Sequence, residues 1–368
     1  MVMEWLLTNM IKFDINYTFK KARAGEINTK FGKIKTPVFM PVGTLGTVKG
    51  ISKEVLHQYN YDIILANTYH LMLRPGTEVI KKFGGLNEFM AWNKSILTDS
   101  GGFQVMSLGK NVTVDKEGVT FRSHLDGSLV RLNAEKSIEI QRILNSTITM
   151  SFDECIPYPF SYLDTEDSLN RSTIWTKRSL DAFKKRKGYG IFGIVQGGMH
   201  KELRKKSSEY LSNLDFDGYA IGGLAVGEGH ELMADITDYS SSMLPIEKPR
   251  YLMGVGYPKD ILQAVKNGVD MFDCVLPTRS GRTGLAFTSN GIIKIKNSIY
   301  KKDITPLDNQ CSCEICLNYS KSYLHHLVRS SEILGSVFLT QHNLYFYKNF
   351  MNRIREAIIN ETLDHFKL

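Results

Sequence analysis

Long apolar runs, low-complexity tracts and a cysteine-rich composition are all missing from this chain of 368 residues. Because no apolar run approaches the roughly 20 residues that cross a bilayer, the sequence predicts no transmembrane helix. Because no tract of strongly biased composition occurs, nothing predicts an extended disordered segment. The first residues form a short apolar patch without a basic leader, unlike a secretory signal peptide. We therefore expect a soluble, cytoplasmic, globular protein.

Cysteine is scarce, with five residues in all, and three of them lie close together. So few cysteines, without a secretory signal, do not predict a disulfide framework. Clustered thiolates and an imidazole can instead complete the tetrahedral shell of Zn²⁺, and a shell of four protein ligands leaves no open position for a substrate. We therefore predict one structural zinc ion per chain, bound by Cys311, Cys313, Cys316 and His342.

The fourth zinc ligand has alternatives, because His325 and His326 lie nearer to the cysteines in the sequence. We prefer His342 because residues 319–337 have the apolar periodicity of a helix that would return the chain toward the cysteines. The remaining cysteines, Cys155 and Cys274, are then expected to be free thiols.

Negative charge is in deficit: 46 Lys and Arg residues face 38 Asp and Glu residues, for a net charge of +8. This balance fits a polyanionic partner such as nucleic acid. The densest basic stretch, residues 177–187, falls on a predicted helix. Such a stretch can be a solvated helix face or an RNA contact, and the sequence leaves both interpretations open.

From residue 36 onward, short apolar or β-branched runs alternate with amphipathic helical stretches, which indicates parallel strands joined by helices. Eight strands are predicted, at residues 37–43, 62–68, 95–101, 147–154, 190–198, 218–224, 250–256 and 269–277. Helices are predicted between most of them, at residues 53–59, 134–144, 166–187, 201–214 and 258–267. Eight is the strand number of a (β/α)₈ TIM barrel, which we prefer over an open doubly wound sheet.

Three regions lie outside this alternation. Residues 1–36 are predicted to be an N-terminal extension and β-hairpin that precede a barrel of residues 37–277. Residues 104–133 read as an insertion of short strands, with a tight turn at Asp126-Gly127. Residues 278–368 are predicted to form a smaller helical subdomain that zinc holds together.

Acidic residues follow several predicted strands, at the barrel end where active sites form. Asp99, Asp153 and Asp273 end the third, fourth and eighth strands. Such carboxylates suit acid–base or nucleophilic catalysis, including double displacement at a glycosidic bond. A catalytic metal is disfavoured because the first strand lacks a His-x-His motif and His70 is the only imidazole near this rim. Asp153 and its neighbour Glu154 could instead cap a helix.

The same strand ends carry groups that suit a purine. A carboxamide at Gln196, the Asp153 carboxylate and backbone N–H groups at Gly222-Gly223 match the donor and acceptor edge of guanine. Phe103 and Met253 could enclose its faces, although ordinary core packing would also explain them.

Two arginines lie just after the last predicted strand. The stretch from Thr278 to Arg282 places Arg279 and Arg282 in what we predict to be a flexible loop. Such guanidiniums suit phosphate or base contacts, with a structural salt bridge as the alternative.

Longer motifs carry a family resemblance: Pro41-Val-Gly-Thr, Asn67-Thr-Tyr-His-Leu, Thr98-Asp-Ser-Gly-Gly-Phe-Gln, Phe152-Asp-Glu-Cys, Ile221-Gly-Gly-Leu-Ala-Val-Gly-Glu and Met271-Phe-Asp-Cys-Val-Leu-Pro-Thr-Arg. With these motifs, the chain from about residue 11 to its end resembles the bacterial tRNA-guanine transglycosylases, or queuine tRNA-ribosyltransferases. The first ten residues look additional, with Met10 as an alternative start. The resemblance implies a zinc-bearing barrel, a homodimer and tRNA as partner.

The implied reaction exchanges guanine at the wobble position of the tRNAs for Asp, Asn, His and Tyr with 7-aminomethyl-7-deazaguanine. Asp273 would be the nucleophile that forms a covalent enzyme–RNA intermediate, and Asp99 would transfer protons. One alternative is a barrel glycosyl hydrolase acting on a nucleoside or RNA, and another is a nonenzymatic RNA-binding protein built on the zinc-binding region.

The resemblance also implies two sets of binding residues. The base would contact Asp99, Ser100, Gly101, Gly102, Phe103, Asp153, Cys155, Gln196, Gly222, Gly223, Leu224 and Met253. The RNA would contact Gly254, Val255, Gly256, Tyr257, Pro258, Lys259, Asp260, Thr278, Arg279, Ser280, Gly281 and Arg282.

Overall fold

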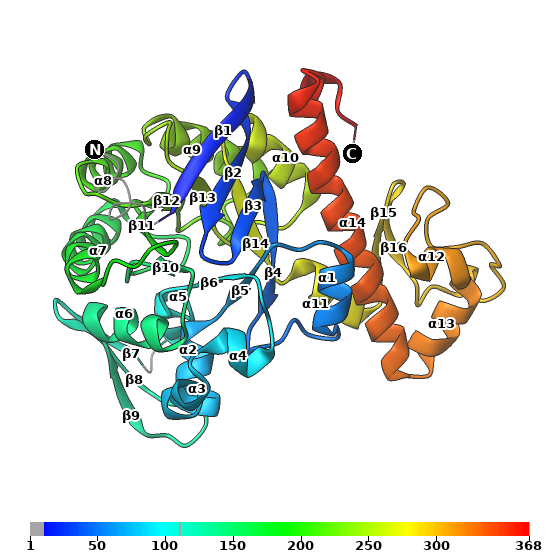
Figure 1. Ribbon diagram of the computed structural model, residues 1–368, viewed down its shortest axis with the longest axis horizontal. Helices are drawn as coiled ribbons and strands as arrows, with labels where there is room; N and C mark the ends of the chain where they lie inside the picture. The colour runs from blue at the N-terminus through cyan, green and yellow to red at the C-terminus, as the bar shows by residue number, and fades with distance from the viewer. Residues whose placement is uncertain (1–10, 110–111, 368) are drawn as a thin grey trace.

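The computed structural model describes residues 11–109 and 112–367, and in this part of the chain eight parallel strands close into a barrel (Figure 1). Each barrel strand pairs with the next, and the last pairs with the first. The predicted TIM barrel is confirmed, and every predicted strand contains an observed one. The barrel strands are β4 (Val38–Gly43), β5 (Ile63–Ala66), β6 (Ser95–Thr98), β10 (Ile148–Met150), β11 (Gly190–Val195), β12 (Gly218–Ile221), β13 (Arg250–Leu252) and β14 (Met271–Cys274).

The barrel strands are buried along most of their length because both faces of the sheet are covered. One apolar cluster contains side chains from every barrel strand, among them Met40, Leu65, Met150 and Ile194, and it fills the interior. A filled interior leaves the rims as the places where a ligand can bind.

Helices surround the barrel, and all five predicted ones are present. They are α1 (Lys53–Gln58), α6 (Ala134–Ile143), α7 (Tyr162–Ala182), α8 (Lys201–Ser212) and α10 (Pro258–Lys266). Asn133 caps α6, because its side chain accepts from the backbone N–H of Lys136. The structure adds α9 (His230–Ser242) and, between β5 and β6, α2 (Thr68–Leu71), the π-helical η1 (Met72–Gly76), α3 (Thr77–Phe83) and α4 (Leu86–Met90). These last segments are too short for a helical periodicity to stand out.

Two small antiparallel sheets accompany the barrel. The predicted N-terminal hairpin has a further strand, giving β1 (Lys12–Phe19), β2 (Ala22–Thr29) and β3 (Gly32–Thr36), whereas residues 1–10, including Met10, lie outside the described residues. The predicted insertion begins with α5 (Gly102–Met106) and continues with β7 (Val112–Asp115), β8 (Gly118–Arg122) and β9 (Leu129–Leu132). The predicted turn at Asp126-Gly127 joins β8 to β9, with Gly127 at φ 73°.

The chain after the barrel differs from its prediction in two places. Residues 278–282 are not a loop, because they lie within α11 (Leu276–Thr283). The single helix predicted at residues 319–337 is two helices, since α13 ends at Arg329 and Ser331 has a left-handed backbone with φ 57°. The elements that follow α11 are β15 (Leu285–Thr288), β16 (Gly291–Lys294), η3 (Ser298–Tyr300), α12 (Glu314–Asn318), α13 (Lys321–Arg329), α14 (Ile333–Ile359) and η4 (Leu363–His365).

The long helix α14 connects the C-terminal elements to the barrel, along which it runs in Figure 1. Its residues Tyr347, Phe350 and Ile354 share a buried cluster with Phe39 of β4 and Ile261 of α10. Helix α14 therefore helps to cover the barrel while its first half carries His342. None of the helices in the described parts of the chain combines the length and apolarity needed to cross a membrane.

Candidate active site

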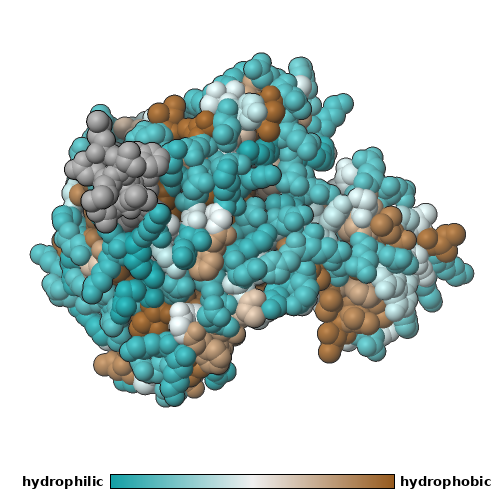
Figure 2. All heavy atoms as spheres, viewed as in Figure 1, coloured by the Kyte–Doolittle hydropathy of each residue, from teal (hydrophilic) through white to brown (hydrophobic). Residues whose placement is uncertain are grey.

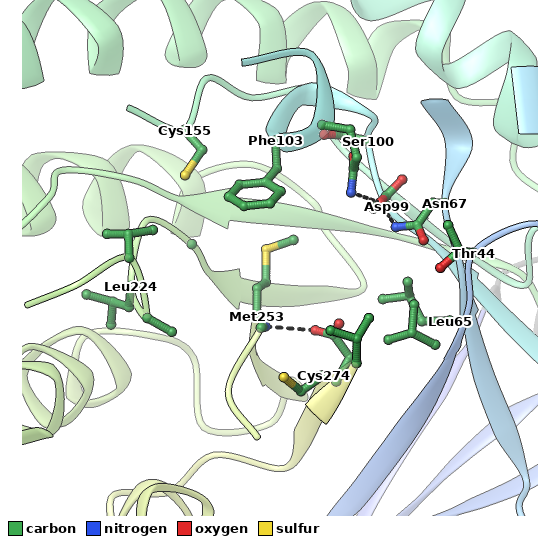
Figure 3. Close-up of a pocket in the computed structure, with 18 of the residues that line it drawn as sticks. Thr44, Leu65, Asn67, Asp99, Ser100, Phe103, Cys155, Leu224, Met253 and Cys274 are labelled. Carbon is green, nitrogen blue, oxygen red and sulfur yellow. Dashed lines mark hydrogen bonds between the residues drawn. The ribbon is translucent and has the colours of Figure 1, made fainter. Parts of the chain in front are cut away.

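A cavity of about 570 Å³ opens at the carboxyl ends of the barrel strands (Figure 3). This volume suits a small ligand such as a nucleobase. The predicted site residues that line it are Asp99, Ser100, Phe103, Asp153, Cys155, Gln196, Gly222, Gly223, Leu224, Met253, Gly254, Asp273, Thr278, Arg279 and Arg282.

Asp99 follows β6 and is held by donors from two neighbouring segments. Its Oδ1 accepts from the backbone N–H of Thr68 at 2.8 Å, and its Oδ2 accepts from Gln104 Nε2 at 2.8 Å and from Asn67 Nδ2. Burial raises the pKa of Asp99 to about 6, although these hydrogen bonds oppose the shift. The carboxyl group can therefore gain or lose a proton near neutral pH, as an acid–base catalyst must.

Asp273 lies near the end of β14 and is partly buried. Its Oδ1 accepts from Tyr251 Oη at 2.5 Å and from the Gly254 N–H at 2.8 Å. Among the described residues, no donor binds Oδ2. Burial raises the pKa of Asp273, while the two hydrogen bonds favour its charged form. An oriented carboxylate with one uncommitted oxygen is suited to nucleophilic attack.

The two carboxyl groups face the same cavity from separate strands. β14 pairs with β4, β4 with β5, and β5 with β6, so three pairings separate Asp273 from Asp99 around the barrel. The charge of Asp273 contributes to the raised pKa of Asp99. Two acids in different environments can divide the roles of nucleophile and proton carrier.

Asp153 and Gln196 form a polar edge of the cavity. Asp153 Oδ2 accepts from Gln196 Nε2 at 2.7 Å, and its Oδ1 accepts from Ser100 Oγ at 2.8 Å. Burial raises the pKa of Asp153. Gly101 and Gly102 do not line the cavity but shape the turn beside it, because a Cβ at Gly102 would lie 2.3 Å from the Asp153 carbonyl oxygen.

Glycines also shape the turn after β12. Gly223 has φ +66°, and a Cβ there would lie 2.6 Å from Gln196 Oε1. Cys155 lies beside this turn, and burial raises the pKa of its thiol to about 12. The thiol therefore stays protonated at neutral pH and is a poor nucleophile.

The side chains of Phe103 and Met253 face each other in the cavity in Figure 3. Phe103 is 54% exposed, which argues against ordinary core packing. Met253 is only partly buried, and part of its side chain packs on the barrel core. These apolar groups can enclose a planar ligand beside the polar edge.

The arginines of α11 have their guanidiniums at the cavity rather than in salt bridges. Among the described residues no carboxylate pairs with Arg279 or Arg282, although Arg282 Nε donates to the Thr278 carbonyl oxygen at 3.2 Å. Ser280 and Gly281 are buried on the other side of the helix, where a Cβ at Gly281 would lie 2.6 Å from the backbone nitrogen of Thr340. The helix therefore packs on α14 through Gly281 and leaves both arginines at the cavity.

The second predicted RNA-contacting segment is mostly outside the cavity wall. Within residues 254–260 the cavity lining includes Gly254, while Val255 and Gly256 are buried. Tyr257 is 55% exposed, and Pro258, Lys259 and Asp260 begin α10, where Asp260 pairs with His230. RNA contacts at these residues stay predictions.

Glu154 and the basic stretch of residues 177–187 form ion pairs that are structural. Glu154 does not line the cavity and makes a bidentate ion pair with Arg171, at 2.6 and 3.0 Å. In the basic stretch of residues 177–187, Lys177 pairs with Asp181, and Arg178 pairs with two glutamates. This stretch lies near the end of α7, which points away from the carboxyl ends of the strands, so a solvated face is the better interpretation.

Three residues that hold the acids had no assigned role in the sequence. Tyr251 looked like an ordinary buried strand residue, whereas Asn67 and Gln104 lay inside the motifs that carry the family resemblance but had no predicted contact. A hydroxyl inside an apolar strand was the available signal for Tyr251. Lys49 and His70 also line the cavity.

The cysteine cluster is assembled as predicted. One ligand atom from each of Cys311, Cys313, Cys316 and His342 lies within 4.8 Å of the others, so the group could hold a metal ion. The distances from His342 Nδ1 to the sulfur atoms are 3.3, 3.5 and 3.8 Å, close to the roughly 3.5 Å that follows from tetrahedral bonds of ~2.3 Å to sulfur and ~2.0 Å to nitrogen.

The hydrogen bonds of His342 and His325 favour His342 as the fourth ligand. His342 Nε2 lies 2.7 Å from the Phe287 carbonyl oxygen, so it carries the proton and leaves the Nδ1 lone pair toward the thiols. His325 Nδ1 faces the carbonyl oxygen of Ile295 instead.

Comparison with known proteins places this chain in a family. The sequence model described as queuine tRNA-ribosyltransferase matches residues 18–368. Proteins of that name from Rickettsia bellii and Rickettsia typhi are each 57% identical to this chain over 346 residues, covering 94% of this chain and 96% of the relative. The protein of that name from Rickettsia akari is 56% identical over the same length. The coverage and identity of these matches agree with a barrel that presents the expected acids in one cavity. The chain therefore belongs to the queuine tRNA-ribosyltransferase family of transferases.

Proposed function

We propose that this protein replaces guanine at the wobble position of tRNAs for Asp, Asn, His and Tyr with 7-aminomethyl-7-deazaguanine. The observation that carries the proposal is the convergence of Asp99 and Asp273 on a cavity whose polar edge is Asp153 with Gln196. The name of the Rickettsia relatives, queuine tRNA-ribosyltransferase, supports tRNA as the substrate.

In the first step, the Asp273 carboxylate attacks C1′ of the ribose. The bond between C1′ and the base nitrogen breaks, and an ester between Asp273 and the RNA forms. Asp99 gives its proton to the departing guanine, which leaves neutral. A pKa of about 6 supports this role because Asp99 can then be protonated at the start of the step.

In the second step, the deazaguanine enters the position that guanine has left. Its ring nitrogen attacks C1′, the ester bond breaks, and the Asp273 carboxylate is released. Asp99, now ionised, accepts the proton from that nitrogen and returns to its starting form. One C1′–N bond replaces another and no net proton is consumed, so the proposed exchange balances without a further reactant.

The cavity supports selection of a guanine-like base. Asp153 can accept from the amino and imino hydrogens, and Gln196 can donate to the keto oxygen. Phe103 and Met253 would cover the two faces of the ring. Arg279 and Arg282 would contact the neighbouring nucleotides, where a guanidinium binds phosphate well.

We propose Zn²⁺ as the ion of the Cys311 cluster. Three thiolates and one imidazole at tetrahedral spacing are a typical zinc donor set, and their four bonds leave no position for substrate. Bound there, Zn²⁺ would supply structural cross-links between α12 and α14. It would thereby stabilise α14, the helix against which α11 packs through Gly281.

We also propose that the protein is a homodimer through the zinc-binding subdomain. Apolar side chains are exposed on this part of the molecule, where Figure 2 shows hydrophobic surface: Ile333 is 80% exposed, Leu317 70% and Leu334 50%. Exposed apolar groups on one part of the surface favour association, and a second copy of the chain would cover them.

Labelled guanine and unmodified tRNA test the exchange directly. We expect wild-type protein to incorporate label into tRNA and Asp273→Asn to lose all incorporation together with any denaturant-resistant protein–RNA complex. Release of free guanine without incorporation would identify a hydrolase instead. Binding of tRNA without either outcome would contradict an enzymatic role.

A further inference from the structure

Arg204 is a fully buried cation behind the base-binding edge of the cavity. It lies on α8 and is 0% exposed, yet among the described residues no carboxylate forms a salt bridge with it. Burial lowers the pKa of Arg204 to about 10, and the nearby Cys155 and Glu228 only partly oppose this shift. Because burying an unpaired guanidinium is expensive, its contacts require a specific explanation.

The guanidinium holds the backbone on both sides of Gln196. Arg204 Nη1 donates to the Val195 carbonyl oxygen at 3.0 Å, and Nε donates to the Gly198 carbonyl oxygen at 2.8 Å. From the same helix, Ser207 Oγ accepts from the Gln196 N–H at 3.1 Å. Helix α8 therefore fixes this strand end through three hydrogen bonds from two side chains.

The turn after Gln196 fits closely on α8. Gly197 has φ +131°, and a Cβ there would lie 2.7 Å from the backbone nitrogen of Arg204. A residue with a side chain would push the turn off the helix and carry Gln196 with it. The position of the carboxamide thus depends on α8 and not only on the strand.

The third nitrogen of the guanidinium reaches the neighbouring strand end. Nη2 is buried and has no hydrogen-bond partner among the described residues, and a Cβ at Gly223 would lie 3.5 Å from it. The same Cβ would lie 2.6 Å from Gln196 Oε1. Arg204 therefore holds the strand end at Gln196 by hydrogen bonds and packs close to the turn at Gly223.

We propose that Arg204 is a positioning residue for base recognition. It orients the Gln196 carboxamide so that one N–H donates to Asp153 and the other donates to the keto oxygen of the base. The inference rests on the proposed function for the identity of the base. A carboxamide has two N–H groups, and the bond of 2.7 Å to Asp153 Oδ2 uses one of them. The planar fork of arginine donates from separate nitrogens in fixed directions, whereas the lysine ammonium is a single nitrogen with rotatable donors.

Direct binding of guanine, measured by titration calorimetry, tests this role without requiring exchange. Arg204→Lys keeps the charge but loses the fork, and we expect the Kd for guanine to rise about tenfold, as is typical when hydrogen bonds to a charged group are lost. The preference for guanine over 6-thioguanine, which has sulfur in place of the keto oxygen, should fall by a similar factor. The preference over hypoxanthine, which lacks the amino group, should stay because Asp153 is retained.

Arg250→Lys is the matched control. Arg250 is also buried and donates to two carbonyl oxygens, of Leu244 at 2.7 Å and Gly268 at 3.5 Å, but it does not line the cavity. We expect a similar loss of thermal stability and an unchanged Kd. Ser207→Ala, a milder change on α8, should raise the Kd about fivefold by losing one neutral hydrogen bond.

A double-mutant cycle completes the test. If Arg204 acts through Gln196, then Arg204→Lys should add little to the effect of Gln196→Ala on guanine binding. Full additivity, or an unchanged Kd in both Arg204→Lys and Ser207→Ala, would overturn the assignment. Wild-type protein that binds guanine but does not exchange it would refute the proposed function and leave this assignment standing.

Discussion

The hydroxyl group of Tyr251 donates a 2.5 Å hydrogen bond to Oδ1 of Asp273 from the adjacent barrel strand. Burial raises the pKa of Asp273, and this hydrogen bond is the main interaction that opposes the rise. Tyr251 is itself buried, and its own pKa is raised well above the ordinary value, so it remains a donor. The bond therefore keeps the carboxylate charged and oriented for attack.

Tyr251→Phe should slow formation of the covalent RNA complex about tenfold at neutral pH, because a hydrogen bond to a charged group is lost. The pKa of Asp273 should rise in the variant. On acidification the variant should therefore lose activity at a higher pH than the wild type does. A pH–rate profile measures this shift. Tyr219→Phe removes a hydroxyl that binds the Leu214 carbonyl oxygen elsewhere in the barrel and should leave the profile unchanged.

Asp99→Asn should remove catalysis but stabilise the fold at high pH. The pKa of Asp99 in the folded protein is about 6, above its ordinary 3.8, so the folded state binds this proton more tightly than the unfolded state. Stability therefore falls as the pH rises from about 4 to about 6, by up to ~3 kcal/mol. Urea unfolding should show Asp99→Asn to be more stable than wild type at pH 8 and no more stable at pH 4. A difference that is constant with pH would contradict this account.

Arg279→Ala and Arg282→Ala should each weaken tRNA binding and leave free guanine binding unchanged. If each arginine neutralises one phosphate, the slope of log K against log salt should become shallower by about one unit per substitution. Filter binding across a salt series measures the slope. Arg178→Ala, at the ion-paired end of α7, should bind tRNA like wild type.

Cys316→Ser should lose zinc and lower the melting temperature, since removing a structural metal typically destabilises the part of the protein it holds. Metal analysis of the purified protein should find one zinc ion per chain in wild type and much less in the variant. Cys274→Ser is the matched control and should retain zinc, because Cys274 is outside the cluster. Equal zinc content in Cys316→Ser and wild type would show that the ligand set is wrong.

Ile333→Asp should convert a dimer to a monomer by placing a charge on the exposed apolar surface. Light scattering after size exclusion gives the mass directly. Ile246→Asp changes an isoleucine that is also strongly exposed, at 69%, but lies beyond α9, and it should leave the mass unchanged. A wild-type protein that is monomeric at every concentration would contradict the proposed dimer.

Local sequence patterns predicted the alternating strands and helices well, because parallel strands buried on both faces are short apolar runs between amphipathic helices. The helix α9 and the segments from α2 to α4 were missed. In α9, buried serine and threonine residues blur the apolar face, and from Thr68 to Met90 the helices are too short to show one. Residues 319–337 were predicted as one helix because the periodicity continues through a turn that Ser331 makes with a left-handed backbone.

The sequence by itself determined which residues could do chemistry: acids at strand ends, a glycine-rich turn, and cysteines spaced for a metal. Their identities and order along the chain carry that information without any fold. Only the tertiary structure decided which groups hold these residues in place. Tyr251 binds Asp273 from the adjacent strand, and Asn67 binds Asp99 from the end of another strand. Arg204 supports the backbone beside Gln196 from a helix. Such contacts arise where neighbouring strands pair and where α8 folds back on β11, and no local pattern encodes these geometries.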